Sequence, residues 1–183
     1  LIMTYFKLMA PILMFFCADT LNAQPSANMF LGTPAHVRVK NKVANDCFNR
    51  MSWKLNAGAA VRTTPVADDI NIYFGNEKGD FFCADQLTGK KLWKFSSSYP
   101  IHTSAALKNG TVFFSDSKQT LYALSSSTGK ITWQKSLGKD KPYDWKFDFL
   151  WSSPTISGDT IYFGSCDGNL YAVQASSGKV FWK

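Results

Sequence analysis

Few side chains of this sequence have the chemistry and spacing that catalysis or metal binding requires. The chain has two histidines, far apart, and a single glutamate, Glu77. Beyond the N-terminal segment, Cys47, Cys83 and Cys166 form neither a Cys-x-x-Cys motif nor an adjacent pair. Metal sites need several such ligands at characteristic spacings, and nucleophilic catalysis needs a nucleophile beside a base. We therefore assign no catalytic, cofactor-binding or metal-binding residue and expect a non-catalytic protein.

One segment has the side chains of a recognition loop. Residues 139–147 interleave aromatic and charged side chains within an insertion between two repeats. Large aromatic side chains are frequent anchors of protein interfaces. The candidate protein-binding residues are Tyr143, Trp145, Lys146 and Phe147. The alternative is that this loop packs back onto its own repeat.

An internal repeat organises the rest of the chain, over residues 63–95, 103–136 and 152–183. Equivalent glycines, which step by 40 and 49 residues, are Gly89, Gly129 and Gly178. Equivalent tryptophans, which step by 40, 40 and 49 residues, are Trp53, Trp93, Trp133 and Trp182. Repeats of this length are typical of propeller blades and other repeat architectures. The longer last step contains the insertion that carries the candidate loop.

Each repeat has the pattern of four short strands. Turn residues recur about every 8–10 positions, and Val, Ile, Tyr and Phe are frequent between them. No segment keeps an apolar period of 3.6 residues. We predict an all-β fold, a β-propeller of four-stranded antiparallel blades with about three blades present. The expected elements are a closing strand over residues 51–56 and blades over about 62–95, 103–136 and 151–183.

The signature residues are interpreted as structural. The turn glycines are expected at positive φ before the last strand of each blade. The tryptophans on that last strand are expected to cross to the next blade and donate the indole N–H to a backbone carbonyl. Cys83, Ala123 and Ala172 provide space for a neighbouring sheet. The alternative for the tryptophans is that they stack on a ligand.

The pattern Leu121-Tyr122-Ala123-Leu124 followed by Thr128-Gly129-Lys130-x-x-Trp133 resembles the PQQ-type, or tryptophan-docking, propeller repeat. The third repeat matches it equally, and the first departs slightly at Phe82-Cys83. The resemblance covers about residues 51–183 and extends to the BamB-like assembly factors and to secreted PQQ-like repeat proteins. Such proteins usually have seven or eight blades, so it implies that the sequence is an N-terminal fragment of a larger ring.

The resemblance implies a non-catalytic, extracytoplasmic scaffold that binds proteins or peptides through its faces and loops. The second hypothesis is part of a quinoprotein dehydrogenase, which would use pyrroloquinoline quinone (PQQ) and calcium. That class needs an adjacent cysteine pair, a calcium site and an aspartate base, and none is assigned here. A third possibility is a recruitment domain attached to a further enzyme or anchor.

The N-terminal segment has the pattern of a secretory signal. Lys7 precedes an apolar run over residues 8–18, and Ala23 is a suitable cleavage position. We predict a signal peptide over 1–23, a lead-in segment over 24–50, no transmembrane span in the mature chain, and a secreted or periplasmic location with possible outer-membrane association. The net charge of +7 comes from scattered lysines. A solvated surface without a nucleic-acid partner is favoured, and an acidic polymer as partner stays open.

Overall fold

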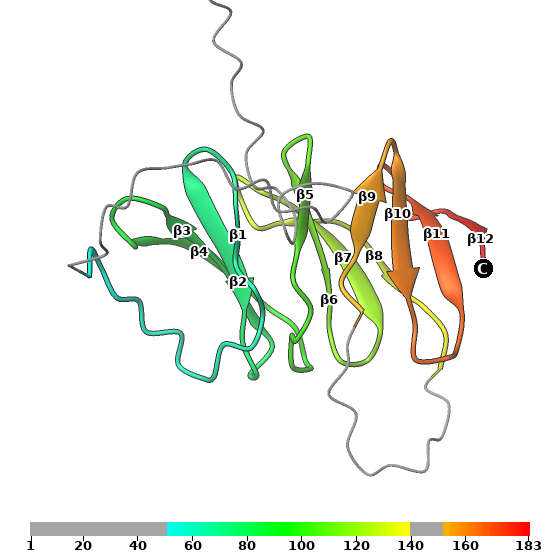
Figure 1. Ribbon diagram of the computed structural model, residues 1–183, viewed down its shortest axis with the longest axis horizontal. Helices are drawn as coiled ribbons and strands as arrows, with labels where there is room; N and C mark the ends of the chain where they lie inside the picture. Colours follow the sequence, from blue (N-terminus) through cyan, green and yellow to red (C-terminus); the bar gives the residue numbers. More distant parts are fainter. Residues whose placement is uncertain (1–50, 140–151) are drawn as a thin grey trace, which may run out of the picture.

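Three four-stranded antiparallel sheets follow one another along the chain (Figure 1). This computed structural model describes residues 51–139 and 152–183. The first sheet contains β1 (Val66–Ala67), β2 (Asn71–Gly75), β3 (Asp80–Asp85) and β4 (Lys91–Ser96). The second contains β5 (Ala106–Lys108), β6 (Thr111–Ser115), β7 (Thr120–Ser125) and β8 (Ile131–Ser136). The third contains β9 (Thr155–Ser157), β10 (Thr160–Gly164), β11 (Leu170–Gln174) and β12 (Val180–Trp182).

In each sheet the strands pair in chain order, so each sheet is one propeller blade. The prediction of an all-β fold with about three four-stranded blades is confirmed. The first strand of each blade begins a few residues after the predicted start of the blade. The residues in between are not paired as strands, because their hydroxyl side chains form hydrogen bonds with other backbone groups. The described ranges contain no helix with the length and hydropathy that a membrane span requires.

The same three-residue ladder crosses the middle of every blade. In the first blade Tyr73 pairs with Cys83, which pairs with Trp93. The equivalent ladders are Phe113–Ala123–Trp133 and Tyr162–Ala172–Trp182. Across the small central residue the outer rings approach to centroid distances of 6.0, 5.9 and 6.1 Å. The small side chain therefore provides space for ring contact within the blade as well as for the neighbouring sheet.

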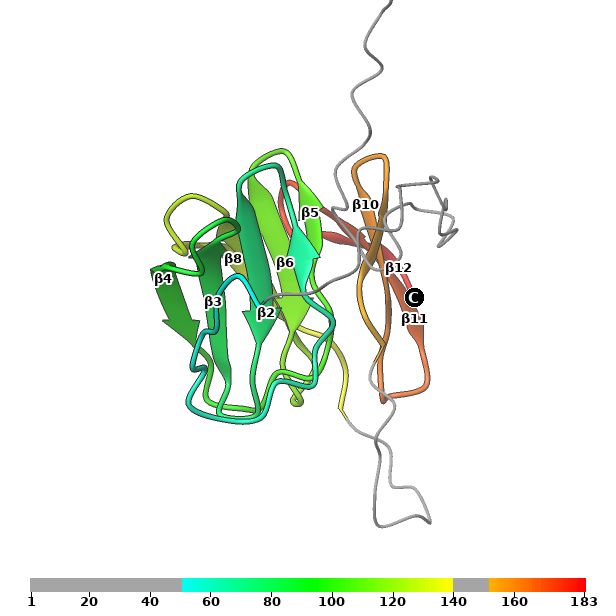
Figure 2. The same cartoon turned by 60° about the vertical axis from the view of Figure 1, so that its left-hand side comes forward.

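The core lies between blades rather than within one. One buried cluster joins the first and second blades, and a second cluster joins the second and third. Phe81 and Phe114 stack across the first interface with ring centroids 3.9 Å apart. Figure 2 shows the first two sheets face to face. Full burial of each such ring stabilises the fold by about 2 kcal/mol, so each blade depends on its neighbour.

The closing strand predicted over 51–56 has no pairing partner among the described residues, which contain none of the last blade it would complete, so it stays a prediction. The segment is held to the first blade by other contacts. Asn76 Nδ2 donates to the Ala57 carbonyl at 2.8 Å, and the Glu77 N–H donates to the Ala60 carbonyl at 3.0 Å. The Trp53 side chain binds the same blade, as described below. Docking of a tryptophan needs one ring and one carbonyl, whereas a strand needs a paired edge.

Several predicted features lie outside the described residues. They are the signal peptide over 1–23, the lead-in segment over 24–50, and the candidate binding residues Tyr143, Trp145, Lys146 and Phe147.

Candidate functional site

The tryptophans of the repeat lie against the turn glycines of the following blade. The glycine turns have φ values of +69°, +68° and +71° at Gly89, Gly129 and Gly178. A β-carbon at these glycines would lie 2.5, 2.6 and 2.8 Å from the rings of Trp53, Trp93 and Trp133, respectively. At these distances the β-carbon of any other residue would overlap the tryptophan ring. Glycine is therefore required here both by the backbone conformation and by the close ring.

Each of these indoles also donates a hydrogen bond to a carbonyl in the turn it covers. The bonds run from Trp53 Nε1 to Gln86 O at 3.0 Å, from Trp93 Nε1 to Ser126 O at 2.8 Å, and from Trp133 Nε1 to Ala175 O at 2.9 Å. A buried indole N–H needs such an acceptor. One ring face and the N–H of each tryptophan are thus used to join blades. Trp182 differs, because half of its surface is exposed.

A second contact between blades lies at the residues before each first strand, where every repeat has two consecutive hydroxyl side chains. The second hydroxyl of the pair joins blades. Ser104 Oγ accepts the Thr64 N–H at 3.1 Å, and Ser153 Oγ accepts the Ser104 N–H at 3.0 Å. The sequence analysis missed this contact, although the pairs Thr63-Thr64, Thr103-Ser104 and Ser152-Ser153 recur at one repeat position.

The first hydroxyl of each pair closes a contact within its own blade. Thr63 Oγ1 donates to the Gly75 carbonyl at 3.2 Å and accepts the Gly75 N–H at 3.1 Å. Thr103 makes the same two bonds with Ser115 at 2.9 and 3.0 Å. Ser152 Oγ accepts the Gly164 N–H at 3.2 Å. These side chains fix where the second hydroxyl lies.

Two aspartates at the lower end of Figure 1, where β6 turns into β7 and β10 into β11, are committed to the fold. Asp116 accepts the N–H groups of Lys118 and Thr120 at 3.0 and 3.1 Å and the Tyr122 hydroxyl at 3.0 Å. It also accepts the Ser97 hydroxyl at 2.8 Å from the preceding linker. Carboxylates that accept so many bonds stabilise turns.

Asp167 has the equivalent role in the third blade. Its carboxylate accepts the Tyr171 hydroxyl at 2.6 Å and both the N–H and the side-chain amide of Asn169 at 3.0 and 2.9 Å. Partial desolvation raises its pKa, but these hydrogen bonds outweigh it and lower the pKa to about 2. Asp167 is therefore ionised at neutral pH and held by its own turn.

The thiol of Cys83 is not a reactive group. It is buried in the ladder between Tyr73 and Trp93. Desolvation by burial raises its pKa to about 11. Since the thiolate is the nucleophile, Cys83 behaves as a small apolar residue at neutral pH.

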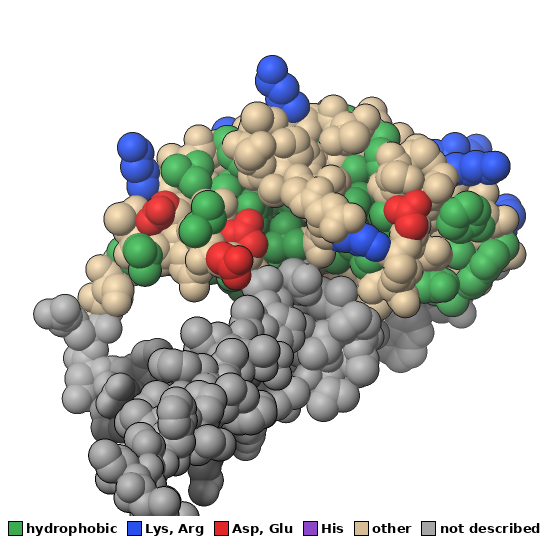
Figure 3. Space-filling model, turned by 90° about the horizontal axis from the view of Figure 1, so that it is seen from above, with side chains coloured by type: hydrophobic (Ala, Val, Ile, Leu, Met, Phe, Trp, Pro, Cys, Tyr) green, Lys and Arg blue, Asp and Glu red, His purple; other side chains and the backbone are tan. Residues whose placement is uncertain are grey.

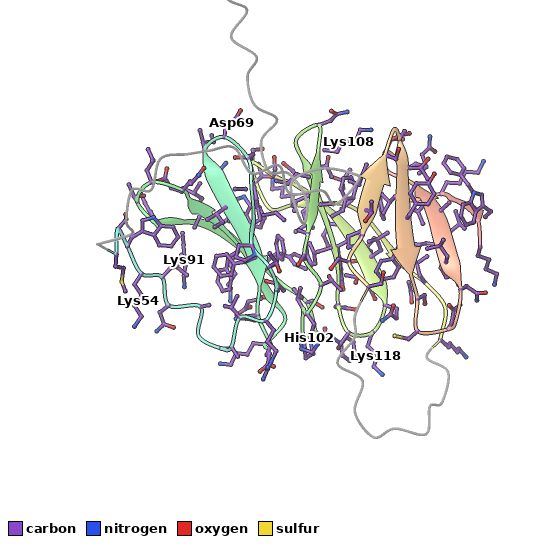
Figure 4. All side chains as sticks on the ribbon, viewed as in Figure 1. Lys54, Asp69, Lys91, His102, Lys108 and Lys118 are labelled. Carbon is purple, nitrogen blue, oxygen red and sulfur yellow. The ribbon has the colours of Figure 1, made fainter. Side chains whose placement is uncertain are left out.

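Arg62, Glu77 and His102 are neighbours at the lower end, where Figure 4 labels His102 and Lys118. The Arg62 guanidinium and the Glu77 carboxylate form an exposed ion pair. The pKa of His102 is lowered, chiefly by desolvation; Glu77 raises it and Arg62 lowers it. A neutral imidazole beside an ion pair adds polar recognition chemistry to this end.

A shallow hollow of about 140 Å³ lies at the upper end, between Asp68 of the first blade and the β5–β6 turn of the second. Asp68 already accepts the Tyr73 hydroxyl at 2.8 Å and two backbone N–H groups. Ligand pockets usually occupy about 300–1,000 Å³, so this hollow suits only a few waters. In the described ranges, no three His, Cys, Asp or Glu side chains come together as a metal site requires.

Comparison with known families gives a match over most of the chain. The family model described as the outer membrane protein assembly factor BamB matches residues 44–183. This confirms the resemblance inferred from the repeat. No curated protein sequence matches the chain.

Solved structures with the same fold include BamB, dehydrogenases and designed proteins. BamB from Moraxella catarrhalis has 19% identity and a TM-score of 0.63, covering 72% of this chain and 39% of its own. Quinohemoprotein alcohol dehydrogenase from Comamonas testosteroni has 18% identity and a TM-score of 0.68, covering 86% and 27%. The computationally designed protein Ika4 has 16% identity and a TM-score of 0.55, covering 69% and 73%. The chain thus spans well under half the length of the two natural proteins, and these likenesses are of fold.

Proposed function

The chain belongs to the family of the outer membrane protein assembly factor BamB, and from that premise we propose that it is a non-catalytic scaffold that binds protein segments outside the cytoplasm. The observation that supports this most is how its polar side chains are used. The aspartates of the lower turns hold the turns themselves, and the repeat tryptophans Trp93 and Trp133 join blades. The exposed linkers and turn tips are then the surfaces left for recognition.

The location outside the cytoplasm is part of the same proposal. It rests on the charged start, the apolar run and the small residue at position 23 of the N-terminal segment. The name of the matched family refers to the outer membrane. The partner that we propose is a protein, bound through the loop with Tyr143 and Trp145.

The test is site-specific photo-crosslinking with the purified full chain. A photoreactive amino acid replaces Tyr143 in one variant and Leu87 in the control, because Leu87 is 87% exposed in the β3–β4 turn of the first blade. After incubation with periplasmic extract, we expect a discrete protein adduct at position 143 and none at 87. Absence of an adduct at 143, or the same adducts at both positions, would contradict the proposal.

The second candidate, part of a quinoprotein dehydrogenase, is favoured only by the fold of the dehydrogenase structures. Two aspartates of the described residues speak against a calcium site at the lower turns. Calcium needs six to eight oxygen ligands, whereas Asp116 and Asp167 are already saturated by their own turns. Titration with PQQ and Ca²⁺, followed by absorbance of the protein fraction, distinguishes the two functions. We expect no bound quinone, and stoichiometric binding would favour the dehydrogenase.

A further inference from the structure

Four exposed side chains follow one another along the lower end of the three blades. Lys78 lies in the β2–β3 turn, Tyr99 in the linker between the first two blades, Lys118 in the β6–β7 turn and Lys139 after β8. We call this set the lower cationic row. Lys78 and Lys118 occupy the same position of the repeat in adjacent blades. The row therefore crosses the blades instead of belonging to one of them.

Three contacts hold Lys78, Tyr99 and Lys118 side by side. The Tyr99 backbone lies against the β2–β3 turn, since a β-carbon at Gly79 would be 2.5 Å from the Tyr99 carbonyl oxygen. On its other side, Lys118 Nζ lies 5.7 Å from the centre of the Tyr99 ring, a cation–π distance. The Ser117 N–H donates to the Pro100 carbonyl at 2.8 Å, which fixes the linker against the second turn.

Lys139 continues the row toward the third blade. It follows Gly138, where a β-carbon would lie 2.3 Å from a carboxylate oxygen of Asp167. The Leu137 N–H donates to the Gln119 carbonyl at 3.0 Å, so this linker also lies against the β6–β7 turn. The second linker therefore places a lysine beside the third blade much as the first linker places Tyr99 beside the second.

The carboxylates of this end are buried or lie in ion pairs, so they are less available at the surface than the lysines. Asp116 and Asp167 are nearly fully buried and accept hydrogen bonds from their own turns. Glu77 pairs with Arg62, and Asp80 pairs with Lys94 at 3.1 Å. What the row presents to solvent is therefore positive charge with one aromatic ring. The upper end differs, because acidic and basic side chains are interspersed there (Figure 3).

We propose that the lower cationic row binds an extended acidic segment of a partner protein. This inference rests on the proposed scaffold function and specifies the chemistry of the partner. Packed sheets lie about 10 Å apart, which is about three residues of an extended chain. A segment in the extended polyproline II conformation, with three residues per turn and a rise of about 3.1 Å per residue, keeps every third side chain on one face, so an acidic residue at every third position matches Lys78 and Lys118. A linear array across blades suits an extended chain better than a lipid headgroup.

The probe for the test is a fluorescein-labelled peptide with glutamate at every third position, and its binding to the full chain is measured by fluorescence anisotropy. The test variant is Lys78→Glu with Lys118→Glu. The matched control is Lys90→Glu with Lys130→Glu, which makes the same charge change on exposed lysines at the other end of the same two blades. Urea unfolding of both variants checks that the fold is retained.

We expect saturable binding that the test variant weakens at least about tenfold and the control less than about twofold, because close charge pairs supply the affinity. Equal weakening by both variants would show attraction by net charge alone and would overturn the proposal. Absence of saturable binding would also overturn it. The proposal would also be overturned if the chain bound phosphatidylglycerol vesicles more tightly than the peptide and the test variant weakened vesicle binding to the same extent. The row would then be a lipid site.

The photo-crosslinking experiment at Tyr143 separates this inference from the scaffold function. If the adduct at position 143 persists in the test variant and the peptide fails to bind, the scaffold proposal stands and the row is not its acidic-segment site. If the peptide binds as expected and no adduct forms at position 143, the row is a peptide site. The proposal that a partner protein binds through the loop then fails.

Discussion

Trp93 of the first blade and Gly129 of the second are in such close contact that a β-carbon at Gly129 would lie 2.6 Å from the Trp93 ring. The Trp93 indole N–H donates to the Ser126 carbonyl in the same turn, at 2.8 Å. The glycine and the tryptophan of the repeat are therefore two halves of one contact, and each half comes from a different blade. This explains why both residues recur with the same spacing.

Replacement of Gly129 tests this contact. Gly129→Ala puts a β-carbon into the Trp93 ring at a φ of +68°. We expect the free energy of unfolding to fall by about 2–4 kcal/mol, from backbone strain together with overpacking. The matched control is Gly110→Ala, with a φ of +71° but only Ser126 Oγ nearby, at 3.9 Å. It should cost about 1 kcal/mol in urea unfolding, and equal losses would contradict the account.

The hydroxyl contact between blades gives a second prediction. Ser104→Ala removes the acceptor of the Thr64 N–H. We expect a loss of about 1 kcal/mol in the free energy of unfolding, the usual net value of one hydrogen bond. Ser127→Ala, at an exposed turn position, is the control and should change stability by less than about 0.5 kcal/mol. If both variants unfold at the same urea concentration, Ser104 does not join the blades.

Gln119 shows where the fold tolerates strain. It has a φ of +62° at a repeat position where the other blades have Gly79 and Gly168. Its side chain is buried, and among the described residues its Oε1 is a buried oxygen without a hydrogen-bond partner. Gln119→Gly should therefore raise the free energy of unfolding by about 1 kcal/mol. A fall in stability would mean that the Gln119 amide contact with Cys166 at 3.2 Å outweighs these costs.

Asp167 predicts how stability depends on pH. Its pKa falls from the ordinary value of 3.8 to about 2 in the folded chain. A lowered pKa stabilises the fold above the ordinary value, and that contribution is lost as the pH falls from about 4 to about 2. Asp167→Asn should therefore weaken the dependence of urea unfolding on pH in this window. If the variant loses as much stability as the original chain between about pH 4 and pH 2, protonation of Asp167 is not the cause of that loss.

The sequence was sufficient for the parts of the fold that depend on unusual residue types. Gly89, Gly129 and Gly178 stand out because only glycine suits a turn with positive φ against a ring. The tryptophans stand out in the same way. The matching spacings of the glycines and of the tryptophans together predict the blades. The strand predicted at 51–56 stays a prediction, because the spacing of Trp53 predicts where its ring docks and not whether its backbone is paired.

The features missed by the sequence analysis consist of ordinary residues in unusual places. Serine and threonine are common in turns, so a pair such as Thr103-Ser104 attracts no notice until its partners on two blades are seen. The positive φ of Gln119 cannot be deduced from its type. Tyr99 and Lys118 are far apart along the chain, and only the packing of the linker brings them together.

Hydrogen exchange of the indole N–H groups tests most directly the claim that the repeat tryptophans join blades instead of stacking on a ligand. In ¹⁵N-labelled protein, the Trp93 and Trp133 indole signals should exchange slowly, because each N–H is bonded across a blade interface. The same indole signals in the urea-unfolded chain are the reference and should exchange quickly. Exchange of Trp93 and Trp133 in the folded chain as fast as in the unfolded chain would contradict the account.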